Sequence, residues 1–376
     1  MKRTAPLLAL LLASACSDKG LYDDAVKAFE RHGYRDYPAA EVRSVLEAKG
    51  FPGLAALDPH ARLVPGRLPV RQREGKAPLS AGLLVGYDRG AVYVLKVFRG
   101  SPAEAAGFRD GDRVLEIDGQ KASPQAVAEK MNDAFGFSLK TERSRPKPAV
   151  TEARLKREEF YFPLVFGFME PGTDTAYVKV GMLVQGSSAA VTAGLEALSS
   201  LGARKLVLDL RDSPGGVPAE AAGLLGAFAP KAGPVLELKS AQPGYSKVFE
   251  AAGRGRFAGL KTAVLTDAGT GMAAEAFAQA LHELNGALLV GGRTMGDVSV
   301  MRTFRLGRGA KGLELTVARI LPPSGLDLEG KGAEPDVRVD ADEKTRQDLR
   351  EAWGASSETA LLGDRAYAAA VGALAK

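Results

Sequence analysis

Gly215 and Gly216 are consecutive glycines whose backbone N–H groups could take part in a reaction. They follow an apolar run typical of a buried strand at 205–210 and precede a helical pattern. A glycine pair at such a turn can present backbone N–H groups to a negatively charged oxygen, as an oxyanion hole requires. A tight strand-to-helix turn also favours glycine for conformational reasons alone. The pair therefore predicts an anion-binding loop, with an ordinary turn as the alternative.

Hydroxyl and imidazole side chains could supply a nucleophile, a base or a metal ligand. Thr270 and Ser299 carry hydroxyl groups, but neither has a lysine or histidine close to it in sequence that could accept the proton. Thr270 is also explained as a cap of the helix that follows it. The chain has three histidines, His32, His60 and His282, and their spacing matches no metal-binding motif. We therefore expect no metal ion and no cofactor.

The first sixteen residues resemble an export signal that ends in a lipidation site. Two basic residues precede a short apolar stretch at 7–12, which is too short for a stable membrane span. Small residues at 13–15 precede Cys16, as in the lipobox of bacterial lipoproteins, and this resemblance implies that Cys16 is diacylated. Ordinary signal-peptide cleavage that leaves a free thiol is the alternative. Cys16 is the only cysteine, so the chain can form no internal disulfide and no cysteine-based metal site.

Composition agrees with export and argues against a nucleic-acid partner. Without Lys2 and Arg3, 48 basic residues remain against 45 acidic ones, a net charge of +3 with no basic cluster. A single thiol suits an oxidising compartment. We expect a lipid-anchored protein on the periplasmic side of a bacterial cell envelope, and Ser17 after the cysteine favours the outer membrane.

Hydrophobic periodicity divides the rest of the chain. Short helices are predicted at 17–29 and 38–49, followed by a linker rich in proline, arginine and lysine at 65–80. From residue 159, short apolar strands alternate with helices, which predicts an α/β core around a buried sheet. The expected strands are 177–180, 205–210, 262–265, 287–290 and 313–320. One expected helix carries Val191, Leu195 and Leu198 on one face, and terminal helices are expected at 345–353 and 365–375.

Residues 81–158 resemble a PDZ domain of the bacterial protease type. Pro102 can open a short helix that Gly107 ends, and Asp118-Gly119 predicts a tight hairpin turn. A helix at 124–134 would border the peptide groove. Leu84 replaces the small residue common at its position. The resemblance implies that a peptide's C-terminal carboxylate binds at the loop formed by Gly82, Leu83, Leu84 and Val85.

The segment 208–216, Leu-Asp-Leu-Arg-Asp-Ser-Pro-Gly-Gly, resembles the oxyanion loop of the carboxyl-terminal processing (tail-specific) serine peptidases. Residues 57–60 and 330–336 resemble two further motifs of that family. The resemblance implies an α/β fold: a Clp/crotonase-like peptidase core with an inserted, mostly β PDZ domain and a small N-terminal helical region. The expected divisions are a signal peptide at 1–15, a helical region and linker at 16–80, the PDZ domain at 81–158, the core at 159–340 and C-terminal helices at 341–376.

The same resemblance places the family's nucleophile, base and supporting amide at Met272, Asp297 and Met301. A thioether has no proton to lose, and an aspartate, with a reference pKa of about 3.9, cannot replace a lysine base at neutral pH. We therefore expect no catalytic residue, with Gly215 and Gly216 as a remnant of the oxyanion loop. The Met272 side chain should fill the space of an acyl group. Asp297 should reach solvent or pair with a basic residue such as Arg293.

Three functions follow from these patterns. The leading interpretation is a periplasmic pseudopeptidase that binds protein C-termini or extended peptides, and through its core a partner protease. The first alternative is an active serine-type C-terminal processing endopeptidase, which would need a relocated nucleophile such as Thr270 or Ser299. The second alternative is a structural envelope scaffold whose PDZ groove is vestigial.

Overall fold

The computed structural model describes most of the chain. The described residues are 20–65, 79–88, 91–97, 100–109, 111–123, 126–127, 130, 136–144, 147–159, 165–307, 311–340 and 364–375. The expected signal peptide, Cys16 and the expected helix at 345–353 lie outside these residues, as do most of the linker and of the helix at 124–134. Across the described ranges, no helix combines the length and the apolar character that crossing a membrane requires.

A six-stranded sheet forms the centre of the core, in the order β10-β11-β12-β15-β16-β19. Only β10 runs antiparallel to its neighbour, while the other pairings are parallel. Four of the expected apolar runs are confirmed as β11, β12, β15 and β16. The bounds are Val165–Met169 for β10, Thr175–Val180 for β11, Lys205–Asp209 for β12, Lys261–Thr266 for β15, Leu288–Gly291 for β16 and Val337–Arg338 for β19.

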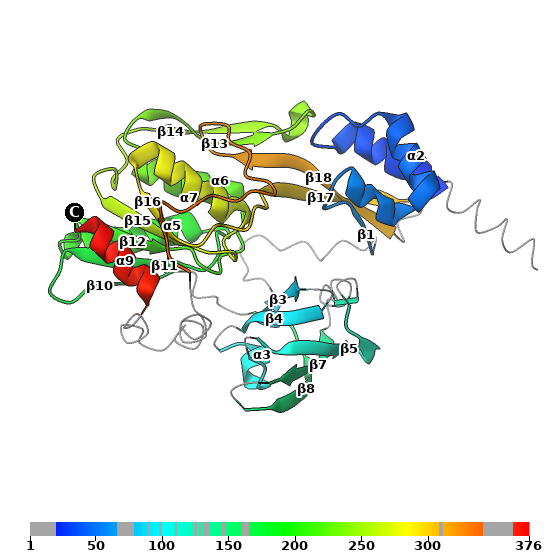
Figure 1. Cartoon of the computed structure of the whole chain (residues 1–376), viewed down its shortest axis with the longest axis horizontal. Helices are drawn as coiled ribbons and strands as arrows, with labels where there is room; N and C mark the ends of the chain where they lie inside the picture. Colours follow the sequence, from blue (N-terminus) through cyan, green and yellow to red (C-terminus); the bar gives the residue numbers. More distant parts are fainter. Residues whose placement is uncertain are drawn as a thin grey trace, which may run out of the picture.

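Both faces of this sheet are covered by helices, which explains why its strands read as continuous apolar runs. Val178 and Leu206 belong to a core cluster with α5 (Ser187–Ser200), α6 (Pro218–Phe228) and α7 (Met272–Asn285). Their sequence neighbours Tyr177 and Val207 belong to the opposite cluster, beneath α9 (Arg365–Leu374). Figure 1 shows α9 and the three longer helices on opposite sides of the strands. The expected helical face of Val191, Leu195 and Leu198 is confirmed as the buried face of α5.

A second, antiparallel sheet carries the N-terminal region. It contains β1 (Arg62–Pro65), β13 (Ala232–Lys239), β14 (Lys247–Ala252), β17 (Ser299–Leu306) and β18 (Lys311–Leu321). The strand expected at 313–320 therefore forms, but in this sheet instead of the parallel series, because it returns as a hairpin against β17. A helix at 20–32, α2 (Ala39–Lys49) and the 3-10 helix η1 (Phe51–Ala56) pack on Leu306, Leu313 and Leu315.

A separate β-rich unit follows β1 and precedes β10 in the sequence, and Figure 1 shows it below the rest of the molecule. Its strands are β3 (Leu83–Asp88), β4 (Ala91–Val97), β5 (Arg113–Ile117), β6 (Gln120–Lys121), β7 (Phe137–Arg143) and β8 (Ala149–Leu155). Pro102 opens the short helix α3 (Pro102–Ala105), as expected, and the Ser101 hydroxyl caps it. Asp118 and Gly119, with φ of 48° and 73°, make the expected tight turn between β5 and β6. The unit's two ends pair as β2 (Leu79–Ser80) and β9 (Glu158–Glu159).

Candidate functional site

The Gly215–Gly216 loop follows β12 and leads into α6. Both residues have φ values in the range that favours glycine, 109° and 134°. A Cβ atom at Gly215 would lie 2.4 Å from the Cβ of Met272, and one at Gly216 would lie 2.1 Å from the carbonyl oxygen of Leu183. Leu183 N–H donates to Gly215 O, and Val217 N–H donates to Leu183 O. Neither glycine N–H donates to any described residue. The loop is therefore bonded to Leu183 through the Gly215 carbonyl and the Val217 N–H, and both glycine N–H groups are available to a ligand.

Met272 faces this loop from the start of α7. Its φ of +46° lies in the left-handed region, which costs a residue with a Cβ about 1–2 kcal/mol. Its N–H donates to the carbonyl oxygen of Asp297 at 2.6 Å, which ties α7 to the loop between β16 and β17. Met295 lies over the preceding residue, because a Cβ at Gly271 would meet its sulfur at 2.8 Å. Two methionines, Met272 and Met295, therefore lie at this turn.

The hydroxyl groups of Thr270 and Ser299, considered above as substitute nucleophiles, are buried and hydrogen-bonded. The Thr270 hydroxyl donates to Leu210 O at 2.9 Å and accepts the Asp267 N–H at 3.1 Å. The helix cap is instead Gly271, which contributes no side chain, so the interpretation of Thr270 as the cap is wrong. Ser299 is fully buried and donates to Glu329 Oε2 at 3.1 Å.

Asp297 does not pair with Arg293, contrary to one of the expectations. Arg293 forms an ion pair with Glu334. Asp297 Oδ1 accepts the Ser299 N–H at 3.0 Å and lies 3.8 Å from His60 Nε2, with the Asp297 side chain 24% exposed. The partial exposure agrees with the alternative expectation that Asp297 reaches solvent.

Met301, the third family position, lies near the start of β17. The pairing of β17 with β18 shifts register between Val300 and Met301, and Met301 is half-buried opposite Thr316. This shift in register therefore lies at the N-terminal end of β17, close in sequence to Asp297.

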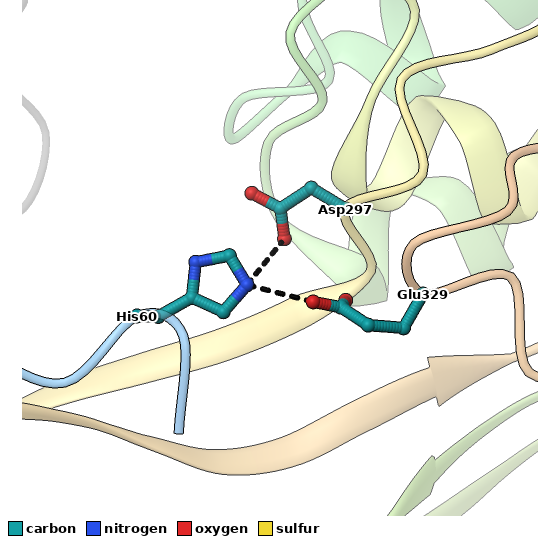
Figure 2. Close-up of side chains that lie close together, drawn as sticks. All are labelled: His60, Asp297 and Glu329. Carbon is teal, nitrogen blue, oxygen red and sulfur yellow. Dashed lines mark hydrogen bonds and ion pairs between the residues drawn. The ribbon is translucent and has the colours of Figure 1, made fainter. Parts of the chain in front are cut away.

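His60, Asp297 and Glu329 come together from three segments (Figure 2). The imidazole Nε2 lies 2.7 Å from Glu329 Oε1. Asp58 holds the backbone that carries this ring, because its buried carboxylate accepts the backbone N–H of His60 at 3.1 Å and two hydrogen bonds from Thr316 of β18. The histidines were expected to lack metal-ligand spacing in sequence, and His60 nevertheless lies beside two carboxylates in the fold. Asp297 and Glu329 lie 237 and 269 positions away from His60 in the sequence, so spacing along the chain could not predict this group. The only sequence signal at His60 is the Leu57-Asp58-Pro59-His60 motif.

Charge and burial shift the pKa values of three groups here. The hydrogen bond to Glu329 raises the pKa of His60, helped by the charge of Asp297 and opposed by burial. Burial disfavours ionisation of Glu329, but hydrogen bonds from His60 and Val298 and the charge of Arg319 lower its pKa. Burial raises the pKa of Glu275 in α7 to about 7, although Thr294 and the N–H groups of Gly296 and Asp297 donate to its carboxylate.

The loop expected to bind a carboxylate leads into the first strand of the β-rich unit. Gly82 has a φ of 74°, and a Cβ there would meet the Ser101 side chain at 2.0 Å. Leu83 is buried, and the register of β3 against β4 shifts between Leu84 and Val85. β3 ends the strand order β3-β4-β5-β7-β8 and thus has one strand neighbour among the described residues. Carboxylate binding at Gly82–Val85 stays a prediction.

The comparisons with known proteins match both parts of the chain. Residues 174–339 match the model of Peptidase family S41, and residues 93–136 match a PDZ domain model. The carboxy-terminal processing protease CtpA of Bacillus subtilis is 26% identical over 254 residues, 67% of this chain and 54% of the relative. A CtpA-like serine protease of Staphylococcus aureus is 26% identical over 254 residues, 66% of this chain and 50% of the relative. The match thus spans about half the length of these curated relatives.

Two solved structures share the fold. A photosystem II D1 C-terminal processing protease gives a TM-score of 0.64 at 23% identity, covering 86% of this chain and 93% of that one. An S41 protein from Bacteroides fragilis gives 0.53 at 16% identity, covering 90% and 95%. These likenesses establish the fold of the chain. They do not show what reaction, if any, its residues carry out.

Proposed function

The chain belongs to the carboxyl-terminal processing peptidase family, and from this membership we propose that it is a lipid-anchored periplasmic pseudopeptidase that binds protein C-termini or extended peptides. One observation carries the proposal. Gly215 and Gly216 have positive φ values and amides that donate to no described residue, and Met272, at the position expected for the family nucleophile, faces them. A binding surface is retained and the reacting group is replaced.

The chemistry of the replacements explains why turnover is not expected. Hydrolysis through an acyl-enzyme needs a nucleophile and a base that takes its proton. Met272 offers a thioether, and Asp297 brings a carboxylate next to the turn where negative charge would develop on the substrate oxygen. Thr270 and Ser299 are buried and hydrogen-bonded, so neither is placed to attack a peptide.

Peptide binding rests on two features. β3 is an edge strand among the described residues, and an extended peptide can add to such an edge through main-chain hydrogen bonds. Near the turn of α7, Met272 and Met295 offer flexible apolar side chains, which adapt to varied partners. Met295 is 45% exposed and so available for contact.

The anchor is a separate part of the proposal and rests on the sequence around Cys16. Mass spectrometry of the mature N-terminus, after expression in a bacterium that processes lipoproteins, should find a diacylated cysteine as the first residue. A Cys16→Ser chain serves as the control and should remain unlipidated. An unacylated Cys16 in the mature protein would exclude the anchor and leave the binding function standing.

The decisive test of the missing activity is cleavage of an unfolded, C-terminally tagged protein over a long incubation. The natural chain should leave the substrate intact, and the triple variant Met272→Ser, Asp297→Lys, Met301→Gln should gain measurable cleavage. Turnover by the natural chain that disappears on Thr270→Ala or Ser299→Ala would show a relocated active site. That result would favour the active endopeptidase over the pseudopeptidase.

A further inference from the structure

We propose that His60, Asp297 and Glu329 form a binding site for one divalent transition-metal cation of the zinc type. The site joins the N-terminal helical region to the core. It includes Asp297, the expected position of the family base, but it depends neither on peptide binding nor on turnover.

The three side chains already point at one another. One ligand atom from each lies within 4.8 Å of the other two, and Figure 2 shows the imidazole nitrogen facing both carboxylates. His60 belongs to the loop before β1, Asp297 to the loop between β16 and β17, and Glu329 to the segment after β18. Only the folded chain assembles this set, so binding of a cation would stabilise the fold.

The two carboxylate ligands are oriented by groups behind them, as in metal sites whose outer partners fix the ligands. Asp58 accepts the backbone N–H of His60 and so fixes the segment that carries the imidazole, and Asp58 is itself held by Thr316. Glu329 Oε2 accepts the Val298 N–H and the Ser299 hydroxyl and pairs with Arg319, which leaves Oε1 turned toward His60.

Asp297 is held in the same way. Its Oδ1 atom accepts the Ser299 N–H at 3.0 Å. Ser299 therefore orients both carboxylates, through its N–H on Asp297 and its hydroxyl on Glu329. A rigid arrangement of this kind lowers the cost of gathering the ligands around an ion.

The donor set selects the class of cation. One imidazole nitrogen with two carboxylate oxygens suits zinc, which binds three protein ligands at about 2.0–2.2 Å and keeps a water as the fourth. Calcium and magnesium prefer all-oxygen sites. The ligand side chains are 16–24% exposed, so a hydrated ion can reach them.

Forming the site requires modest movement. Ligand atoms around a tetrahedral zinc ion lie roughly 3.3 Å apart. The 2.7 Å contact between His60 and Glu329 would open slightly, and the 3.8 Å contact between His60 and Asp297 would shorten. Arg319 opposes binding through its positive charge, while the two carboxylates favour it.

Calorimetric titration of zinc into the chelator-treated, dialysed full chain tests the site. The natural protein should bind one equivalent. His60→Gln, Asp297→Asn and Glu329→Gln should each weaken binding by about 10–100-fold or more, because changes to residues that merely support ligands already have effects of that size. Asp297→Asn keeps an oxygen for the Ser299 N–H, so it should fold even if Glu329→Gln, which disturbs Arg319, does not.

His282→Gln is the matched control. His282 Nδ1 also lies near a carboxylate, 3.4 Å from Asp336, but no third ligand joins them among the described residues. This variant should bind zinc as the natural chain does. Absence of saturable binding to the natural chain, or equal binding by the three site variants, would overturn the proposal. Loss of binding in His282→Gln would overturn it as well.

Discussion

The Met272 N–H donates a 2.6 Å hydrogen bond to the carbonyl oxygen of Asp297. The two positions at which the nucleophile and the base of the resembled family were expected are thus joined through the backbone, independently of their side chains. Because the bond uses only backbone atoms, it can hold the turn between β15 and α7 whatever side chains these two positions carry. It also holds Met272 in the left-handed conformation, which is the basis of the first prediction.

Glycine should be tolerated better than alanine at position 272. Both Met272→Gly and Met272→Ala remove the same thioether, but only glycine adopts φ of +46° without strain. The glycine variant should therefore be about 1 kcal/mol more stable toward urea than the alanine variant. Equal stability, or a more stable alanine variant, would show that the backbone at this turn is unstrained.

Asp58 should be a large contributor to the docking of the N-terminal region. Asp58→Ala leaves the buried Thr316 N–H and hydroxyl without acceptors, which should cost about 2–3 kcal/mol of the free energy of unfolding. Thr316→Val removes only the hydroxyl and should cost about 1 kcal/mol. Denaturant unfolding measures both values. A cost for Asp58→Ala no larger than that of Thr316→Val would contradict the role of Asp58.

Glu275 should make stability fall as pH rises. Its pKa is raised from 4.5 to about 7 in the folded chain, so the folded state holds the proton more tightly than the unfolded state. Its contribution is therefore most favourable below pH 4.5, declines as the pH rises toward 7 and then levels off. The total change is on the order of 3 kcal/mol, since one pKa unit corresponds to about 1.4 kcal/mol.

Glu275→Gln isolates this effect, because glutamine does not titrate. The stability of the variant relative to the natural chain should rise between pH 4 and pH 8, whatever constant offset the amide introduces among the surrounding N–H donors. Thermal unfolding at several pH values in a common set of buffers provides the measurement. A pH-independent difference would show that Glu275 ionises normally.

Peptides with a free C-terminus should bind the β-rich unit more tightly than their amidated forms. The expected receptor is the loop at Gly82–Val85, whose amides would meet the carboxylate. Fluorescence titration of paired free and amidated peptides with the full chain tests this. Gly82→Ala should weaken the binding of only the free forms. A Cβ at position 82 would clash with the Ser101 side chain and displace the loop that is expected to receive the carboxylate. Equal affinity for both forms would argue against capture of the carboxylate.

Local elements of this fold could be predicted from the sequence. The apolar runs predicted the strands from β11 to β16 of the parallel sheet because burial on both faces leaves little room for polar residues. The turn at Asp118-Gly119 and the start of α3 at Pro102 followed from backbone preferences of single residues. Periodicity could not reveal that the run at 313–320 belongs to the second sheet, since it reports burial and not the choice of neighbour.

The contacts of polar residues were harder to predict. Arg293 stood near Asp297 in sequence yet pairs with Glu334, and Thr270 turned its hydroxyl to Leu210 instead of capping α7. His60 contacts Glu329, which lies 269 positions away in the sequence. Each of these outcomes depends on how loops from different elements converge, which spacing along the chain does not encode.

The pairing of β2 with β9 has a consequence for how this protein could arise and be altered. The chain leaves for the β-rich unit and returns from it along two adjacent antiparallel strands, Leu79 opposite Glu159 and Ser80 opposite Glu158. Among the residues that the structure describes, the apolar cluster inside the unit shares no residue with the clusters of the core or of the N-terminal region. The unit is therefore an exchangeable cassette: another domain with neighbouring ends could be grafted at the same two strands, giving the scaffold a new recognition module without rebuilding its interior.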